Sequence, residues 1–333
     1  MLCELGLRPV METTTSVPSG REMRLFNTGQ TWPLLAEARS APFWTIHRGD
    51  LHQALATALE QRAPGAIHVG SRCLGFEQDA DGVTLLLEHG ESVRGDVLIG
   101  ADGVHSRIRR VLSGEGRATF TGLMAWRAVI PMERLPVRLR HHGFVAWLGP
   151  LGQIVTYPVR QGKLFNFAAT VERDNWHIES RSEAGTVEEC RRDFKNWHAD
   201  VLGIIDCLDI PYKWALIGRP SLERCSAGRV TLLGDAFHPT LPLLGQGANM
   251  AIEDGMIPAR CLEASADVPE ALKRYESARL DRTARIVQSS LDRAHHMRNP
   301  ALADPDQAKA FMDRQFASGG LAINTTGFVI TTQ

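Results

Sequence analysis

The feature that most constrains the fold of this 333-residue chain is the stretch from Arg229 to Gly255, which has the pattern of a buried strand, a loop and a helix. The apolar run 230–233 predicts a strand that breaks at Gly234-Asp235. A proline-marked loop follows, and Gly245-Gln246-Gly247 leads into an apolar helix. Glycines let a ligand approach the backbone, and the first turn of a helix favours negative charge. By itself the stretch predicts either a ligand site or an ordinary strand, loop and helix with turn glycines.

A second turn of the same kind lies at residues 96–110, in DVLIGADGVHSRIRR. The short apolar run 97–99 is typical of a strand covered on both faces. It stops at Gly100, an acid and a glycine follow at Asp102-Gly103, and a helix is expected to begin next. Asp235 can accept hydrogen bonds from sugar hydroxyls, as acidic residues do in nucleotide-binding folds. Two such turns in one chain are harder to ascribe to chance than one.

Between the two turns the chain changes in character, because residues 119–180 are rich in β-formers and aromatics separated by Gly, Pro and polar turns. This pattern predicts an antiparallel sheet inserted between two halves of an α/β domain, where it would close over a ligand. Further strands are expected at 66–69, 83–88 and 93–99. Helices are expected after Asp50 and after Asp267, each acting as an N-cap.

The second of these helices is long and amphipathic. Its expected buried stripe consists of Leu272, Tyr275, Ala278, Val287, Leu291 and Ala294. Its arginines, at positions 274, 279, 282, 285 and 293, are expected in solvent.

The composition argues against several classes of protein. The chain has 37 Lys and Arg against 38 Asp and Glu, so neither nucleic acid nor a membrane is expected as a partner. Its six cysteines form no CxxC pair, which argues against a zinc site or a disulfide framework and favours a reducing cytoplasm. The chain has neither a membrane-spanning apolar run nor a signal-peptide core. The histidine pairs 141–142 and 295–296 lack metal-ligand spacing, so no metal site is expected.

Taken together, DVLIGADGVHSRIRR, the aromatic strands and LLGDAFHPTLPLLGQGANMAIEDG resemble the single-component flavin-dependent aromatic hydroxylases, in particular the salicylate and 3-hydroxybenzoate hydroxylase branch. The resemblance implies an α/β fold, with an FAD-binding domain of glutathione-reductase type and an inserted antiparallel β-sheet substrate domain. The expected domains are 1–115 and 220–299 for the two parts of the FAD-binding domain, 116–219 for the substrate sheet, and an unassigned segment 300–333.

The function that the resemblance implies is that of a cytoplasmic, FAD-dependent monooxygenase. It would use NAD(P)H and O2 to hydroxylate a small, salicylate-like aromatic substrate through a flavin C4a-hydroperoxide. Two alternatives stay open: a truncated, non-catalytic remnant of such an enzyme, or a related flavoprotein that acts on a quinone precursor or an antibiotic. The oligomeric state is also open, with a homodimer as one option.

Carried over residue by residue, the resemblance implies a cofactor site. Arg48, in HRGDLHQAL, would contact the flavin nucleotide, and Asp102-Gly103 would lie near the pyrophosphate and take part in nicotinamide-nucleotide use. Gly234 and Asp235 would hold the ribityl and pyrophosphate portion of FAD. The backbone N–H groups of Gly245, Gly247, Ala248 and Asn249 would line the pyrimidine edge of the isoalloxazine, where a reduced flavin carries negative charge.

The resemblance also implies a set of catalytic residues. His238 and Pro239 would border the flavin face on which oxygen reacts. In the phenol-hydroxylating branch a histidine four residues before a tyrosine helps deprotonate the substrate, whereas this chain has Gln153 before Tyr157. An amide can orient a ligand but cannot act as a base. Tyr157 is either a pocket residue or a core tyrosine, and Pro242 stands where the branch can carry a glutamine. Either substrate activation differs here, or the substrate is not a simple phenol.

The largest departure from the family pattern is at the start of the sequence. Family members begin with a strand, a GxGxxG turn and a helix that bind the ADP part of FAD, and this sequence has no such motif. A truncated gene model or a natural fragment is therefore expected. With Met1 as the true start, weak or absent FAD binding is predicted, because the diphosphate would lack its helix N-terminus.

Overall fold

The structure, a computed structural model, describes residues 1–34, 43–114, 118–173, 182–317 and 328–331. Its contacts divide the chain into two compact units. The first unit comprises Met1–Leu7, Leu55–Thr119 and Ile217–Leu291, and the second comprises Arg8–Ala54, Phe120–Leu216 and Asp292–Gln333.

The first unit contains two small sheets and the helices that pack on them. One sheet has the strand order β14-β15-β7, with β14 at Ser226–Ala227, β15 at Val230–Leu232 and β7 at Leu98–Gly100. The other is antiparallel, with β4 at Cys73–Gln78, β5 at Val83–Leu87 and β6 at Ser92–Gly95. The helical elements of the first unit are α3 (Arg107–Ser113), η3 (Gly234–Ala236), η4 (Pro242–Leu244) and α6 (Gly247–Glu263), together with most of α7 (Val268–Met297).

The core of the first unit forms where α3 and α7 pack against the β7–β15 pair. Ile108, Leu232 and Tyr275 are buried in one apolar cluster, and the Tyr275 hydroxyl donates to the Leu232 carbonyl at 2.9 Å. Gly100 permits the close approach of α3, since a Cβ there would lie 2.8 Å from Ile108. The strand β7 and the helix α3, which follows it in the sequence, therefore pack in direct contact.

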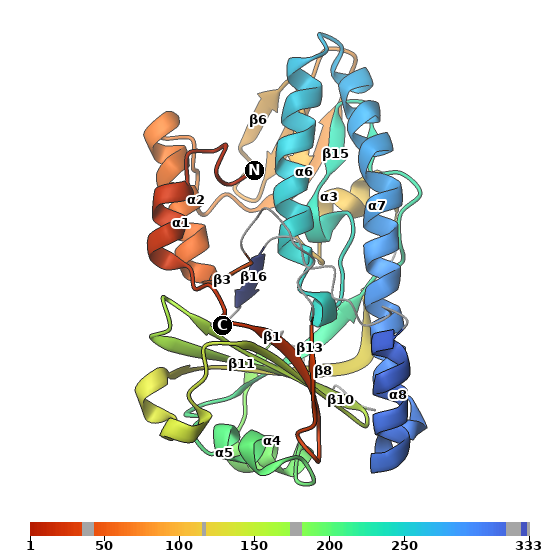
Figure 1. Cartoon of the computed structure of the whole chain (residues 1–333). Helices are drawn as coiled ribbons and strands as arrows, with labels where there is room; N and C mark the ends of the chain where they lie inside the picture. The colour runs from red at the N-terminus through yellow and green to blue at the C-terminus, as the bar shows by residue number, and fades with distance from the viewer. Residues whose placement is uncertain (35–42, 115–117, 174–181, 318–327, 332–333) are drawn as a thin grey trace. The chain divides into compact units, whose positions relative to one another are not determined.

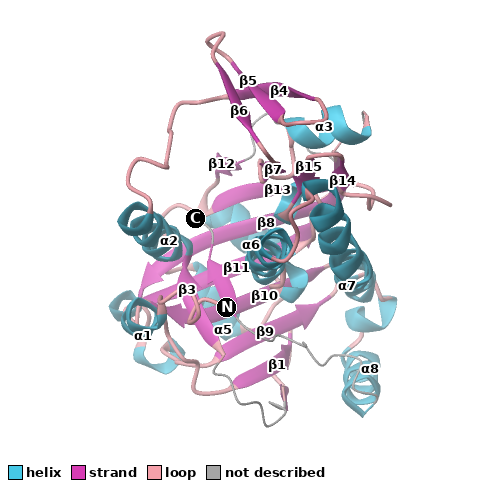
Figure 2. Ribbon diagram, turned by 90° about the horizontal axis from the view of Figure 1, so that it is seen from above, coloured by secondary structure: helices cyan, strands magenta, loops and turns pink. Residues whose placement is uncertain are grey.

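The second unit is built on an eight-stranded sheet with the order β12-β13-β8-β11-β10-β9-β1-β2, whose central strands Figure 2 shows side by side. The pairs β12–β13, β8–β11, β11–β10, β10–β9 and β1–β2 are antiparallel, whereas β1 and β9 are parallel. The strands are β1 (Arg21–Leu25), β2 (Thr31–Pro33), β8 (Thr119–Pro131), β9 (Phe144–Gly149), β10 (Gly152–Val159), β11 (Leu164–Glu172), β12 (Ser182–Ala184) and β13 (Tyr212–Gly218).

Smaller elements complete the second unit. They are α1 (Arg8–Thr14), η1 (Met132–Arg134), η2 (Val137–Leu139), α4 (Val187–Asp193), α5 (Ala199–Ile205), η5 (Pro300–Ala303), α8 (Pro305–Ala317) and the parallel pair β3 (Trp44–His47) and β16 (Phe328–Thr331). The helix α2 (Arg48–Arg62) begins in the second unit and continues into the first.

One face of the eight-stranded sheet is apolar and packs under α4 and α5, which Figure 1 places against it. Trp126, Phe165 and Phe167 are fully buried on this face. Gly149 and Gly152 make room for the ring of Trp197, to which added Cβ atoms would come within 2.8 and 3.2 Å. This face is the hydrophobic core of the unit.

Several fold expectations need correction. Residues 66–69 form no strand, and Val69 is exposed between the turn glycines at 65 and 70. The expected strand 93–99 is split by a bend into β6 and β7, which belong to different sheets. The run 97–99 is not covered on both faces, because Leu98 is only partly buried and Ile99, on the opposite face, is 36% exposed.

Of the two N-cap residues expected from the sequence, only one caps its helix. Asp267 caps α7, with its carboxylate accepting from the Glu270 N–H at 3.2 Å. Asp50 does not cap α2, which begins earlier at Arg48; its carboxylate instead pairs with Arg160 through two hydrogen bonds of 2.8 Å.

The arginines of α7 are the clearest correction. Arg279 and Arg293 were expected in solvent, but they are 1% and 4% exposed. In the expected buried stripe of α7, Ala278 and Leu291 are exposed instead.

Residues 8–54 group with the eight-stranded sheet, because β1 and β2 extend that sheet at one edge. The domain bounds proposed from the sequence placed them in the cofactor-binding part, and those bounds stay a prediction. In the described part of the chain, no helix is both long and apolar enough to cross a membrane. Within those same residues no group of three or more His, Cys, Asp and Glu side chains is arranged to hold a metal ion.

Candidate functional site

The two acid-and-glycine turns of the sequence lie side by side in the first unit. Because β7 and β15 are parallel, with Leu98 opposite Val230 and Gly100 opposite Leu232, their carboxyl ends reach the same edge of the sheet. The Leu233 N–H donates to the Gly100 carbonyl at 3.0 Å and continues the ladder to the turns themselves. In open α/β sheets this edge is where ligands bind.

The turn after β15 brings an exposed carboxylate next to a helix start. Gly234 has a φ of +57°, a left-handed conformation that a residue with a side chain adopts only with strain. Asp235 follows it and is exposed. A Cβ on Gly247, the first residue of α6, would lie 4.0 Å from the Asp235 carboxylate and 3.3 Å from the Thr240 methyl group. The glycine keeps this corner open to a ligand.

The N-terminus of α6 has no side chain that caps it. The first helical hydrogen bond runs from the Met250 N–H to the Gln246 carbonyl at 2.9 Å. Gly247, Ala248 and Asn249 form the first turn, and the dipole of this 17-residue helix favours negative charge beside their N–H groups. Gly245, with a φ of +64°, ends η4 and turns the chain into α6.

Asp102 has a structural partner. Its carboxylate accepts from the backbone N–H groups of Arg107 at 2.6 Å and Ile108 at 3.3 Å, so it supports the start of α3. Gly103 takes the left-handed turn between them, with a φ of +77°. Roles for Asp102 and Gly103 near a pyrophosphate stay a prediction.

Behind the Gly234 turn lies a buried charged cluster. Asp254 of α6, fully buried, accepts from the Gly234 N–H at 2.8 Å, from His238 Nε2 at 2.5 Å and from Arg279 Nε at 2.6 Å. Arg279 also donates to Glu253 at 2.7 Å, and Glu253 pairs with Arg282 as well. The cluster fixes the β15 turn to both α6 and α7.

The electrostatics of the cluster favour a charged carboxylate. Burial alone would raise the pKa of Asp254, but the His238 and Gly234 hydrogen bonds and the Arg279 charge outweigh it and lower this pKa below its ordinary value. The pKa of Glu253 is lowered in the same way, against the effect of burial, by Arg282 and Arg279. The buried ion pairs therefore persist at neutral pH.

Arg109 holds the same turn from the opposite side. It is 3% exposed and donates to three backbone carbonyls, those of Ala236 at 3.2 Å, Phe237 at 2.9 Å and Pro220 at 2.6 Å. Burial, with a smaller effect of the Arg219 charge, lowers the pKa of Arg109 to about 10. The segment from Gly234 to His238 is thus held by Asp254, through the Gly234 N–H and the His238 ring, and by Arg109, through the carbonyls of Ala236 and Phe237.

Three buried polar atoms near this turn have no hydrogen-bond partner among the described residues: His238 Nδ1, Thr240 Oγ1 and Gln246 Nε2. Pro239, also buried, lies between the first two in the sequence. An unsatisfied buried polar group costs about 1–3 kcal/mol. Three of them within nine residues, directly before an uncapped helix start, point to a ligand with several polar edge atoms.

The second unit carries a different set of candidate residues, on the sheet face opposite to its apolar core. Residues paired across neighbouring strands share a face. The register pairs Gln153 with Thr170, Tyr157 with Asn166, and Ala168 with Arg127, and these positions alternate along their strands. We call this the polar face. It carries Arg127, Gln153, Tyr157, Asn166 and Thr170, and the same registers place Ala125, Val129, Ala146, Leu148, Val155 and Ala168 on it.

Most polar side chains of this face are buried, whereas Arg127 is partly exposed. Tyr157 stacks on Phe144 at 5.6 Å, and burial raises the pKa of its phenol, so Tyr157 is a hydroxyl donor at neutral pH and not a base. Burial lowers the pKa of Arg127, an effect to which the nearby Arg48 charge adds. Asn166 Nδ2 is buried without a hydrogen-bond partner. Gln153 Oε1 accepts from Arg293 Nε at 3.1 Å.

The structure therefore gathers the sequence-predicted residues into two groups. Asp102, Gly103, Gly234, Asp235, His238, Pro239, Gly245, Gly247, Ala248 and Asn249 belong to the first unit, and Arg48, Gln153 and Tyr157 to the second. The residues that sequence reasoning missed are the buried ion-pair partners, above all Asp254 and Arg279. Helical periodicity could have found Arg279, since it falls four residues after Tyr275 on the buried stripe.

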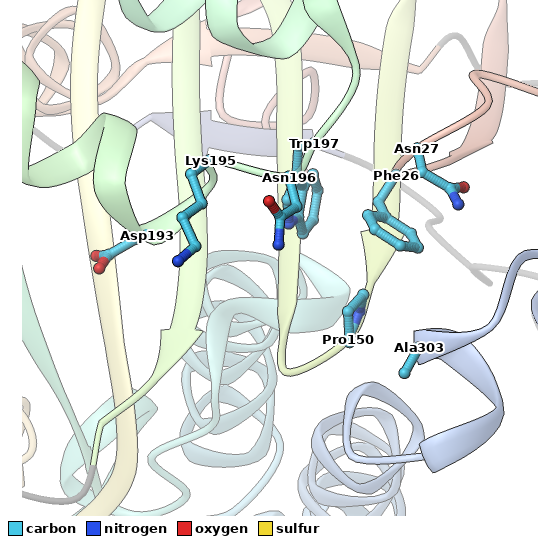
Figure 3. Close-up of a pocket in the computed structure, with 8 residues that line it drawn as sticks. All are labelled: Phe26, Asn27, Pro150, Asp193, Lys195, Asn196, Trp197 and Ala303. Carbon is cyan, nitrogen blue, oxygen red and sulfur yellow. The ribbon is translucent and has the colours of Figure 1, made fainter.

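A surface pocket of about 450 Å³ in the second unit contains none of the predicted site residues (Figure 3). It is lined by Phe26, Asn27, Pro150, Asp193, Lys195, Asn196, Trp197 and Ala303. Trp197 also packs on the apolar face, so this pocket does not open on the polar face.

The chain is similar to known proteins along most of its length. A family model described as FAD binding domain matches residues 1–290. A 3-amino-4-hydroxybenzoate 2-monooxygenase from Streptomyces platensis is 35% identical over 307 residues, which cover 90% of this chain and 76% of that protein. A 3-hydroxybenzoate 6-hydroxylase from Polaromonas naphthalenivorans is 35% identical over 261 residues, which cover 77% of this chain and 64% of that protein. The crystal structure of Klebsiella pneumoniae HpxO complexed with FAD and uric acid has a TM-score of 0.82 at 25% identity, and the match covers 97% of this chain and 84% of that one.

Proposed function

Because the chain belongs to the family of FAD-dependent aromatic hydroxylases, we propose that it uses NAD(P)H and O2 to hydroxylate a small aromatic acid. When bound, FAD supplies the oxygen-activating chemistry of such an enzyme. The substrate class is taken from the relatives, whose names give hydroxybenzoates as their substrates. A cytoplasmic location is part of the proposal and agrees with six free cysteines.

The observation that carries the proposal is the group of unpartnered buried atoms before α6. The residues present fit an isoalloxazine, because this ring system has polar atoms along one edge and becomes negative there on reduction. The N–H groups of Gly247, Ala248 and Asn249 would hold that edge. His238 Nδ1, Thr240 Oγ1 and Gln246 Nε2 would supply further hydrogen bonds.

Other residues of the first unit would hold the rest of the cofactor. The exposed carboxylate of Asp235 would accept from ribityl hydroxyls, and Gly234 would let the cofactor approach the backbone. Asp254 and Arg109 bind the backbone of the turn itself, and their task would be to keep this turn in one conformation before FAD binds. Arg48 lies in the second unit, and its contact with the nucleotide stays a separate prediction.

The polar face would hold the aromatic substrate. It offers hydroxyl, amide and guanidinium donors, but Gln153 and Tyr157 are not bases at neutral pH. We infer that a phenol substrate is oriented here by hydrogen bonds and is not deprotonated by these two residues. The enzyme then depends on a ring that is already electron-rich, or on loss of the phenol proton to solvent.

The test is to titrate the purified chain with FAD and then to follow NADH and NADPH oxidation with salicylate and the hydroxybenzoate isomers. The proposal expects saturable FAD binding, oxidation stimulated by at least one acid, and ¹⁸O from ¹⁸O2 in the product. Stimulated oxidation that yields only hydrogen peroxide with every acid would contradict it, and would favour a flavoprotein of a different substrate class. Failure to bind FAD would favour the non-catalytic remnant.

A further inference from the structure

One buried arginine in the second unit has no acidic partner. Arg293, near the end of α7, is 4% exposed; its Nε donates to Gln153 Oε1 at 3.1 Å, and its Nη2 contacts Met23 Sδ at 3.8 Å. Both partners are neutral. In the described part of the chain, no carboxylate lies within the 4.0 Å of an ion pair with this guanidinium.

Other arginines of the same helix and its end show what a satisfied guanidinium looks like in this protein. Arg279 faces both Asp254 and Glu253, and Arg298 donates to Glu172 at 2.6 Å. A guanidinium has five N–H donors, and two neutral acceptors leave most of that capacity unused. Burial lowers the pKa of Arg293 to about 10, so the group remains charged at neutral pH.

A buried charge without a counter-charge is costly, and an anionic ligand that supplies the opposite charge would remove this cost. Gln153 places the Arg293 guanidinium at the polar face, the same face that carries Tyr157 and the unpartnered Asn166 amide. The small residues Ala146 and Ala168 also lie on this face, on either side of Val155. The chemistry is complementary to a flat, oxygen-rich anion.

We propose that Arg293 binds the carboxylate of the aromatic acid substrate and sets the preference of the site for ring acids over neutral rings. Gln153 acts as its positioning residue, because it holds Nε and leaves the rest of the guanidinium to the ligand. Arg–carboxylate pairs are frequently bidentate, which fixes the orientation of the ring as well as its charge. This inference rests on the proposed function, since it names the substrate class of that site.

The experiment compares hydroxybenzoates with the matched hydroxybenzamides, which keep the ring and the phenol but remove the charge. Binding of each isomer to the FAD-loaded protein is measured by calorimetry for the wild type, Arg293→Gln, Arg293→Lys and the control Arg298→Gln. The wild type and the control are expected to prefer at least one acid over its amide by roughly 10- to 100-fold. Arg293→Gln is expected to lose this preference, and Arg293→Lys to keep part of it.

Thermal unfolding without substrate separates binding from folding. Arg293→Gln is expected to melt at the same temperature as the wild type or above it, because it removes an unpaired buried charge. Adding the preferred acid is expected to raise the midpoint of the wild type and of Arg298→Gln, but not of Arg293→Gln.

Two results would overturn the role of Arg293: an Arg293→Gln protein that keeps the wild-type preference for acids, or a wild-type protein that binds no acid of the panel better than its amide. The proposed function is judged separately by ¹⁸O incorporation. Hydroxylation of an amide with no acid preference would keep the monooxygenase and remove the carboxylate anchor.

Discussion

At the scale of single residues, the buried charges of the first unit are the features whose removal has the largest expected effect. Asp254→Asn would leave the Arg279 guanidinium and the His238 ring facing a neutral amide. Breaking one partner of a buried ion pair costs about 3–5 kcal/mol. We expect urea unfolding to show a loss of that size for Asp254→Asn, together with weaker FAD binding, since the β15 turn is released.

The matched control is Glu270→Gln, which breaks the exposed pair of Glu270 with Arg274 on α7. Exposed pairs contribute about 0–1 kcal/mol, so this variant should unfold close to the wild type. Equal unfolding midpoints for Asp254→Asn and Glu270→Gln would mean that the cluster does not hold the turn.

The same carboxylate predicts a pH dependence. The folded pKa of Asp254 is lowered, so its stabilising contribution is complete above its ordinary pKa of 3.8 and is lost as the pH falls through the lower folded value. Above that window the contribution is constant. Acid unfolding of the wild type should therefore be steeper below pH 4 than that of Asp254→Asn, as measured by circular dichroism.

His141 predicts a second acid sensitivity, in the second unit and at higher pH than that of Asp254. Burial, helped by the Arg24 charge, lowers its pKa from 6.5 to about 4. Between these values the unfolded chain binds a proton that the folded chain does not, so stability falls as the pH falls from 6.5 to 4. The shift corresponds to a loss of up to about 3 kcal/mol. His141→Gln should flatten urea midpoints over this range, whereas His142→Gln, at an exposed neighbour, should not.

At the scale of elements, α6 offers two glycines that separate ligand binding from helix stability. Gly247→Ala would put a methyl group 3.3 Å from the Thr240 methyl group, in the corner beside Asp235. We expect FAD affinity to fall by at least ~10-fold, an effect of ~1.4 kcal/mol, because the cofactor can no longer approach the backbone. Fluorescence titration with FAD measures this change.

The control lies in the same helix. Gly255 is exposed, and a Cβ there would meet nothing within 4 Å. Gly255→Ala should raise stability by about 0.5–1 kcal/mol and leave FAD affinity unchanged. Equal FAD affinities of the two alanine variants would argue against a cofactor at the start of α6.

Sequence reasoning succeeded for elements in which local pattern and tertiary role agree. The strand at Val230–Leu232, the helix at Gly247 and the antiparallel sheet all follow from periodicity and turn residues, and the family was recognised from two motifs. It failed where a long-range partner decides the outcome. Asp50 was expected to cap a helix, but Arg160 binds it from a position 110 residues later.

The residues of the candidate site also divide into those that the sequence predicts and those that it does not. The glycines and Asp235 could be named from the sequence because their backbone geometry and spacing form a motif. The partners of the charges that support them could not. Helical periodicity places Arg279 on the buried stripe of α7, but only the fold brings Asp254 to Arg279 and Gln153 to Arg293. Fold and family were therefore predictable, whereas the electrostatic support of the site was not.

At the scale of the whole molecule, the proposed function assigns cofactor and substrate to different units, and hydrogen exchange can test that assignment. Saturating FAD should slow exchange in residues 234–250 of the first unit, and a hydroxybenzoate added afterwards should slow exchange in 152–159 and 292–297 of the second. A ligand at a free concentration of 100 times its dissociation constant adds ~2.7 kcal/mol to the stability of the unit that binds it. Exchange in that unit then becomes roughly 100-fold slower.

The antiparallel β4–β5 pair provides the internal reference, because it belongs to the first unit and contains no proposed contact with either ligand. Its exchange should stay unchanged within a few-fold when each ligand is added. Protection of residues 234–250 by the aromatic acid alone, or of 152–159 by FAD alone, would reverse the assignment. Uniform protection of both units would instead mean that the ligands stabilise the protein as one cooperative body.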